Sequence, residues 1–364
     1  MVDKFPDDSS RLLPVSVLTG FLGSGKTTTL NHVLQHPDFS RTLVLINEFG
    51  EIGLDHELVT HCSDDVVIKM ASGCLCCTIR GDLSKTLREA PGRFARGGKL
   101  WFDRVLIETT GLADPAPILH TLMTERSLTR RYRLDGVITT VDAVNGDATL
   151  DRQVESVKQA AVADRLLLTK TDIAARDVLH GLRDRLRTLN PAAPQILAAN
   201  GAVDPAQLFD AGLFDPRSKS PAVRDWLRAE AFADQQGGRS QNHHHGHHHD
   251  HHHEHDHDHD VNRHDAHIKA FCLTLDEPFD RGALHRWLEE LSRLRGEDLL
   301  RIKGLVNVTG LDGPVVVHAV QHVIHPPVML PTWPSADRRS QLVFITRDIA
   351  EAELRETLPL AQAG

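Results

Sequence analysis

The fold is decided by the stretch Val17-Leu-Thr-Gly-Phe-Leu-Gly-Ser-Gly-Lys-Thr-Thr28. Its glycines and its Gly-Lys-Thr ending have the spacing of a phosphate-binding P-loop, and it follows an apolar run and opens a helical pattern. In such a loop the backbone N–H groups surround the phosphates of a nucleotide, aided by the positive end of the helix. We expect Lys26 to contact the β- and γ-phosphates and Thr27 to ligate magnesium. The full set of residues expected at the phosphates is Gly23, Ser24, Gly25, Lys26, Thr27 and Thr28.

Short apolar runs alternate with longer helical patterns on both sides of this loop. The expected strands are residues 15–18, 42–46, 66–68, 104–107, 136–141, 165–168 and 195–197, and the expected helices are residues 27–35, 83–90, 116–127 and 174–189. Near-continuous apolar strands that alternate with helices are typical of a parallel sheet covered on both faces. We therefore predict an α/β domain with a doubly wound, mainly parallel sheet over residues 1–232.

A second, smaller domain is expected over residues 266–364. Its pattern is a strand at 269–275, a helix at 281–295, three strands at 299–308, 315–324 and 341–346, and a last helix at 349–357. This order predicts a compact α+β domain. His318 and His322 share one face of the expected strand 315–324, and we assign no metal to them.

The composition of the chain argues against two classes of binding partner. The 364-residue chain has a formal net charge of −9 and no apolar run of membrane-span length. A basic face is usual for nucleic-acid binders, so we expect neither a nucleic acid nor a membrane as partner. The first residues lack the pattern of a signal peptide, which favours a cytoplasmic location. In that compartment the five cysteines are expected to be thiols or metal ligands.

Histidines gather in one internal segment. Between residues 243 and 259, 12 of 17 residues are His, and most of the others are Asp or Glu. Residues 233–265 cannot bury apolar surface, so we expect a disordered linker. Imidazoles bind zinc, nickel, cobalt and copper, which suits the capture of metal ions, although a purely solubilising linker remains the alternative.

The nucleotide base is indicated by Thr169-Lys-Thr-Asp172, which follows the strand 165–168. GTPases commonly read guanine at this place with Asn-Lys-x-Asp. Here Thr169 replaces the Asn and leaves one contact open, while Lys170 and Asp172 are present. A helix cap at Asp172 is compatible with the same role. The pattern favours GTP over ATP.

Four further acidic or small residues are candidates for the chemistry. Glu108 ends the strand 104–107, where P-loop enzymes place a carboxylate near the metal, and its length favours contact with magnesium through water. Gly111 could follow the γ-phosphate through its N–H group and act as a switch. Glu51 and Asp55 lie in the loop after the strand 42–46, and either could position water, contact magnesium or ligate a second metal. The expected catalytic residues are Lys26, Glu51, Asp55 and Glu108, with a solvated acidic loop as the alternative for Glu51 and Asp55.

Three cysteines lie within Gly73-Cys-Leu-Cys-Cys77, between the P-loop and Glu108. Thiolates at Cys74, Cys76 and Cys77 can converge on one soft or borderline ion such as zinc or copper(I). Three sulfurs leave an open coordination position, which suits transfer better than permanent structural binding. Buried structural cysteines are the alternative.

Together these motifs resemble the CobW-like metallochaperone GTPases, in the same order along the chain. The resemblance extends to that family's second domain through Arg301-Ile-Lys-Gly-Leu-Val-Asn307 and Val320-Gln-His-Val-Ile-His-Pro-Pro327. It implies a slow, metal-stimulated GTPase that uses GTP and magnesium, binds zinc or cobalt at the three cysteines and delivers it to a client metalloprotein. A homodimer is left open.

Three other functions stay in view. Within the family, a cobalt chaperone for cobalamin synthesis or a nitrile hydratase activator competes with a zinc chaperone. A His-rich metal store with regulatory nucleotide binding is a different class. An ATP-dependent kinase or transferase on the same loop is disfavoured by Thr169-Lys-Thr-Asp172.

Overall fold

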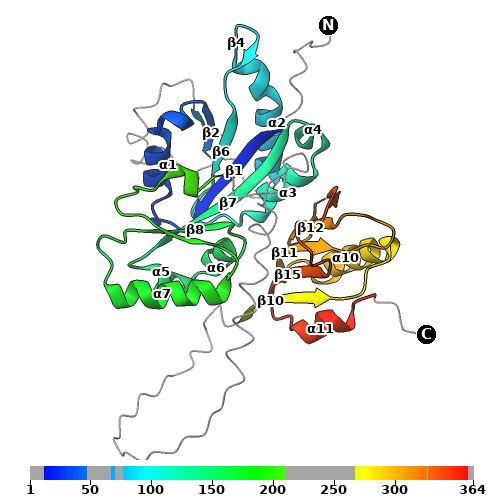
Figure 1. Ribbon diagram of the computed structural model, residues 1–364. Helices are drawn as coiled ribbons and strands as arrows, with labels where there is room; N and C mark the ends of the chain where they lie inside the picture. The colour runs from blue at the N-terminus through cyan, green and yellow to red at the C-terminus, as the bar shows by residue number, and fades with distance from the viewer. Residues whose placement is uncertain (1–11, 47–66, 70–76, 210–266, 326, 360–364) are drawn as a thin grey trace, which may run out of the picture.

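The computed structural model describes residues 12–46, 67–69, 77–209, 267–325 and 327–359. An α/β unit and a smaller unit lie side by side (Figure 1). Within these residues, no helix is both long and apolar enough to span a bilayer. Four predicted site residues (Glu51, Asp55, Cys74 and Cys76) and the histidine-rich segment lie outside the described residues.

A parallel sheet of seven strands organises the larger unit, in the order β3-β2-β6-β1-β7-β8-β9. The strands are β1 (Leu13–Gly20), β2 (Thr42–Ile46), β3 (Val67–Lys69), β6 (Arg104–Glu108), β7 (Tyr132–Asp142), β8 (Arg165–Thr169) and β9 (Gln195–Leu197). The register pairs Leu18 with Glu108 and Gly20 with Thr140, so the phosphate loop and the ends of β6 and β7 meet at one edge. The predicted doubly wound fold is confirmed, and ligands of such sheets bind outside the carboxyl ends of the strands.

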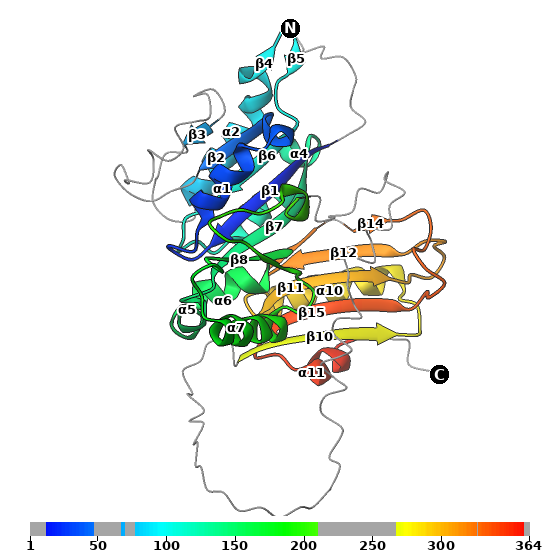
Figure 2. The ribbon, with the colours of Figure 1, turned by 60° about the vertical axis from the view of Figure 1, so that its left-hand side comes forward.

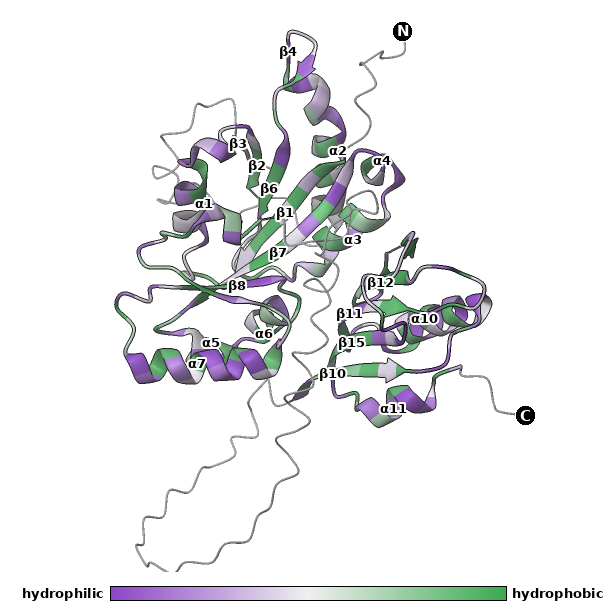
Figure 3. Cartoon of the chain, viewed as in Figure 1, coloured by the Kyte–Doolittle hydropathy of each residue, from purple (hydrophilic) through white to green (hydrophobic). Residues whose placement is uncertain are grey.

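Helices cover both faces of this sheet. They are α1 (Lys26–Leu34), α2 (Cys77–Arg93), α3 (Ala116–Thr124), α4 (Arg126–Thr129), α5 (Gly146–Arg152), α6 (Val154–Ala161) and α7 (Arg176–Leu189), with short 3-10 turns at Pro37–Phe39 and Pro205–Gln207 and a hairpin of β4 (Ala95–Arg96) and β5 (Lys99–Leu100). Successive β1 residues alternate between faces, so Val17 packs with α2 and α3 while Leu18 packs with α1. Figure 3 shows this contrast between apolar central strands and the polar outer side of α7.

Two helical boundaries differ from the sequence-based expectation. The expected helix 116–127 is broken at Glu125, whose extended backbone (ψ 111) ends α3 and starts α4. The expected helix 83–90 is longer, because α2 extends back to Cys77 and forward through Pro91.

The smaller unit is an antiparallel sheet with two helices. Its elements are β10 (Ile268–Leu275), α10 (Arg281–Arg295), β11 (Leu299–Val306), β12 (Val315–Val320), β13 (Val323–Ile324), β14 (Val328–Met329), β15 (Ser340–Arg347) and α11 (Glu351–Glu356). Asp280 caps α10 by accepting hydrogen bonds from the N–H groups of Gly282 and Ala283 at 2.9 and 3.0 Å. The strands run in the order β10-β15-β11-β12-β13, and Figure 2 shows β10 to β12 one beside the other.

The expected strand 315–324 is not continuous. Val320 pairs with Val323, so the chain turns back at Gln321 and His322 and forms a hairpin. His322 therefore lies in the turn and does not share a strand face with His318, which corrects the sequence-based expectation. Two-residue turns of this kind match the twist of the strands that they join.

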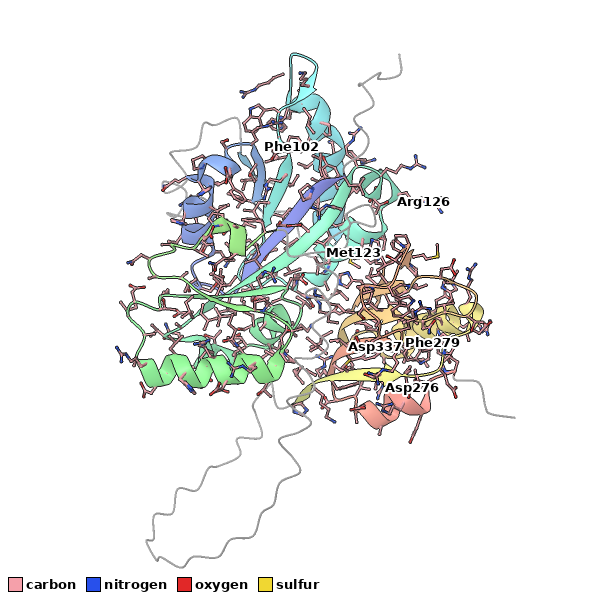
Figure 4. All side chains as sticks on the ribbon, in the orientation of Figure 1. Phe102, Met123, Arg126, Asp276, Phe279 and Asp337 are labelled. Atoms are coloured by element: carbon pink, nitrogen blue, oxygen red, sulfur yellow. The ribbon has the colours of Figure 1, made fainter. Side chains whose placement is uncertain are left out.

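The two units share a packed interface. Val320 and Val323 of the hairpin belong to the same buried cluster as Leu119 and Met123 of α3. Figure 4 shows Met123 on the side of the larger unit that faces the smaller one. Burying a valine side chain contributes about 1.5–3 kcal/mol, so this contact alone favours a fixed arrangement of the two units.

Candidate functional site

The phosphate loop is closed on itself by its lysine. Gly25 has φ 89, a left-handed conformation that glycine adopts without strain, and it starts α1. The Lys26 ammonium donates to the carbonyl oxygens of Gly20 at 2.9 Å and Phe21 at 3.1 Å, so it spans the loop from inside. The Ser24 hydroxyl lies 2.6 Å from the Thr140 hydroxyl and joins the loop to β7. The Lys26 ammonium therefore lies against the backbone of a loop whose type binds phosphates.

Thr27 and Glu108 form the second part of the site. The Thr27 hydroxyl donates to a carboxylate oxygen of Glu108 at 3.0 Å, and Glu108 is only 6% exposed at the end of β6. A hydroxyl and a carboxylate are both oxygen ligands of the kind that magnesium takes beside substrate phosphates. The donor set therefore fits this cation, and the two residues that the sequence assigned to magnesium lie together.

The segment after β6 packs directly on the phosphate loop. A side chain on Gly111 would place its Cβ 2.6 Å from both the backbone nitrogen and Cδ2 of Leu22, so only glycine fits. Thr109 fixes the start of this segment, since its N–H donates to Leu18 O at 3.0 Å and its hydroxyl donates to the Thr19 hydroxyl at 2.8 Å. Gly111 is thus held against the phosphate loop, and its role as a switch stays a prediction from the sequence.

Thr169, at the end of β8, connects this strand to the phosphate loop. Its hydroxyl donates to Ser24 O at 2.7 Å, which ties the segment that is predicted to read the base to the phosphate loop. The next residue, Lys170, has φ 57 and donates its ammonium to Asp142 at 2.7 Å. Asp172 accepts the N–H of Asn200 at 3.2 Å. The replacement of the usual Asn by Thr therefore keeps a contact between the two loops.

Asp142, at the end of β7, is a site residue that sequence reasoning missed. Burial raises the pKa of its carboxyl, but hydrogen bonds from Lys170, from the Asn145 side chain and from the N–H groups of Val144 and Asn145 together lower the pKa below its ordinary value. The ionised carboxylate orients Lys170 and the turn into α5. The only sequence signal was its position after an apolar strand on the loop side of the sheet.

A cavity of about 220 Å³ adjoins this arrangement. Its lining comes from the phosphate loop, the end of β7, the start of α5, α6 and the residue after β8: Phe21, Leu22, Gly23, Ser24, Thr140, Val141, Asp142, Asn145, Gly146, Thr149, Ser156 and Lys170. The cavity joins Gly23 and Ser24 of the phosphate loop to Lys170. The other predicted nucleotide residues that the structure describes (Gly25, Lys26, Thr27, Thr28, Glu108, Gly111 and Asp172) are not part of its lining.

Gln159 of α6 is a second residue that the sequence did not reveal. It is fully buried, and its side-chain amide donates to the carbonyl oxygens of Gly111 at 3.2 Å and Ala113 at 2.9 Å. A glutamine inside a helix has no local signature, so only the tertiary structure identifies it as a support for the Gly111 segment.

The cysteine cluster is described only in part. Cys77 is the first residue of α2, and Cys74 and Cys76 precede the described residues of this helix. Within the part of the chain that the structure describes, no three or more His, Cys, Asp or Glu residues are grouped as a metal site would require. The metal assignment therefore stays a prediction from the sequence.

Comparison with known proteins gives matches over both units. Residues 14–197 match the CobW/HypB/UreG nucleotide-binding domain, and residues 268–361 match the cobalamin synthesis protein cobW C-terminal domain. The chain is 31% identical over 343 residues to the zinc chaperone YjiA of Escherichia coli, covering 94% of this chain and 96% of that protein. It is 28% identical over 380 residues to the zinc chaperone CobW of a Sinorhizobium species, covering 95% and 96%. The Zn(II)-bound crystal structure of the E. coli YjiA GTPase is similar with a TM-score of 0.63 and 29% identity, over 95% of this chain and 98% of that chain.

Proposed function

This chain belongs to the CobW/HypB/UreG family, and from that premise we propose that it is a GTP-hydrolysing metallochaperone that delivers zinc to a client protein. The observation that best supports nucleotide binding is the hydrogen bond between Thr27 and Glu108 next to the phosphate loop. Lys26 bonds to the backbone of this loop. Relatives that align over nearly the whole chain are named zinc chaperones, and this supports zinc as the transported metal.

The residues divide the work on GTP between them. The N–H groups of the phosphate loop and the Lys26 ammonium neutralise the phosphates, and Thr27 and Glu108 would hold magnesium, which would supply further positive charge to the phosphates. Asp172 accepts hydrogen bonds from the guanine edge, with Lys170 alongside it. Gly111 contacts the third phosphate through its N–H group. Positioning and electrostatic stabilisation of the transferred phosphoryl group then account for hydrolysis.

The cysteine segment follows, in the sequence, a strand that ends near Glu108. It lies between Lys69, where β3 ends, and Cys77, where α2 begins. Lys69 is in register with Ile46 of β2, and Ile46 is in register with Glu108. Two strand spacings put the end of β3 about 10 Å from Glu108, on the edge of the sheet that carries the phosphate loop. This closeness supports a metal site that responds to the state of the nucleotide, with transfer through the open fourth position.

GTP hydrolysis by the purified full-length protein tests the enzymatic part. We expect turnover that Lys26→Ala abolishes and that depends on magnesium. The store hypothesis predicts nucleotide binding with negligible turnover in both proteins, and that result would exclude the proposal. A comparison of GTP with ATP separates it from a kinase or transferase.

Zinc titration against GTP affinity tests the coupling. We expect zinc to change GTP affinity in wild type and not in Cys77→Ala, because linkage between the two sites is reciprocal. Cys272→Ala is the matched control, since Cys272 is a free, partly buried thiol on β10. Equal GTP affinity with and without zinc in wild type contradicts the coupling. If the protein binds cobalt more tightly than zinc, cobalt takes the place of zinc as the proposed transported metal.

A further inference from the structure

Asp114 is the point where the Gly111 segment, α6 and the smaller unit meet. One of its carboxylate oxygens accepts the N–H of Ala116 at 2.9 Å, at the start of α3. The other oxygen accepts the Lys158 ammonium at 3.1 Å and the Gln321 side-chain amide at 3.0 Å. Asp114 lies three residues beyond Gly111, so the smaller unit holds the segment that packs on the phosphate loop.

Gln321 makes this contact from an unfavourable backbone conformation. It lies in the two-residue turn between β12 and β13 with φ 50, a conformation that glycine or asparagine adopts more readily. An amino acid kept in such a conformation points to a role for its side chain. The side-chain amide of Gln321 is the group that reaches Asp114.

The turn that carries Gln321 is held in place by its own contacts, so the position from which Gln321 reaches Asp114 is fixed. The Gln321 N–H donates to Leu299 O at 2.9 Å, and the flanking Val320 and Val323 are packed in the cluster that contains α3. On the opposite side, Gln159 holds the carbonyl oxygen of Gly111. Gly111 can therefore leave the phosphate loop only if contacts to α6 break and if Asp114 either loses Gln321 or moves with the turn.

We propose that Gln321 is a positioning residue for the nucleotide site, which acts through Asp114 to hold Gly111 against the phosphate loop and so favours triphosphate over diphosphate. This inference rests on the proposed function, because it requires GTP at this loop. Only the triphosphate carries the third phosphate that a switch glycine contacts. Loss of the Gln321 amide therefore weakens binding of the triphosphate and leaves diphosphate binding unchanged.

The test compares Gln321→Gly with wild type in the full-length protein. Glycine accepts the positive φ, so the variant keeps the turn and loses only the amide. The measured quantities are the dissociation constants of GDP and of a non-hydrolysable GTP analogue, both with magnesium, and the thermal midpoint. We expect the preference for the analogue over GDP to fall about tenfold to a hundredfold, the effect of one hydrogen bond to a charged group, with an unchanged or raised midpoint.

Two further variants make the result specific. Asp348→Gly also replaces a residue with positive φ (54) in the smaller unit, where its side chain contacts His267, and should leave the preference unchanged. Gln321→Lys supplies a new donor to Asp114 and should restore the preference. An unchanged preference in Gln321→Gly, or no restoration by Gln321→Lys, overturns the inference while the proposed function stands. A wild type that binds neither nucleotide overturns both.

Discussion

Replacing Lys303 by methionine should stabilise the protein near neutral pH, because Lys303 is the surplus charge of a buried cluster at the interface. The Lys303 ammonium donates to the Asp164 carboxylate at 2.7 Å, and the Arg301 guanidinium donates to the same oxygen. The second Asp164 oxygen accepts the N–H of Val137 at 2.9 Å. Two cations thus share one carboxylate, and the side chains of Lys303 and Asp164 are only 7% and 3% exposed.

The pKa values of the two partners give the size of the effect. Burial raises the pKa of Asp164, but Arg301 and Lys303 outweigh burial and hold it far below its ordinary range. For Lys303, burial and then the Arg301 charge lower the pKa from 10.5 to about 8, against the attraction of Asp164. This environment therefore favours the ionised carboxylate and disfavours the protonated lysine. The difference between the two lysine pKa values corresponds to about 3 kcal/mol of unfavourable free energy when Lys303 is protonated.

The sign of the pH dependence follows from proton binding. Between pH 8 and pH 10.5 the unfolded chain carries a proton on this lysine that the native protein has lost. The free energy of unfolding therefore rises with pH across this window, and the full penalty is present below it. Lys303→Met removes the penalty and also one hydrogen bond to Asp164, so we expect a net gain of about 1–3 kcal/mol at pH 7. The gain should shrink as the pH approaches 10.5.

Denaturant unfolding at a series of pH values, followed by circular dichroism, measures this difference. Lys269→Met is the matched control, because Lys269 lies on β10 of the same unit with an exposed side chain. Its unfolding free energy should follow that of wild type at every pH. If Lys303→Met destabilises the protein at pH 7, or if its difference from wild type does not change with pH, Lys303 is not a surplus charge.

Other substitutions test single contacts of the site and the interface. Asp164→Asn leaves two buried cations without a compensating charge and should lower the free energy of unfolding by about 3–5 kcal/mol, measured by denaturant titration. Thr169→Val removes the tie to Ser24 O and should weaken GTP and GDP binding equally, by about 1 kcal/mol, in calorimetric titrations. Asp172→Asn exchanges an acceptor for an amide and should shift the preference from GTP toward xanthosine triphosphate in competition binding. Glu108→Gln should reduce the magnesium affinity of the nucleotide complex about tenfold or more while nucleotide binding without magnesium persists, as fluorescence titration would show.

Local patterns were sufficient for the sheet and for the phosphate loop. The strands are buried on both faces, so they are continuous apolar runs, and the loop residues have to follow one another in order. The break at Glu125 was harder to foresee, because no glycine or proline marks it and Leu128 of α4 is buried like the apolar residues of α3. The turn at Gln321 was missed for a related reason, since glutamine is not a turn-forming residue and its strand neighbours are valines.

Contacts between segments that are distant in the sequence limit the prediction of the site in a different way. Gln159, Asp142 and Asp114 act through partners that tertiary folding brings together, and no spacing in the sequence names those partners. Arg301 and Lys303 are an instructive intermediate case. They lie two residues apart, hence on one face of β11, and every residue of this strand is buried. Two cations on one face of a buried strand require an anion from elsewhere, because their desolvation is otherwise too costly. The sequence alone therefore indicates that an acidic residue must pair with Arg301 and Lys303. Only the fold shows that this residue is Asp164, at the interface between the two units.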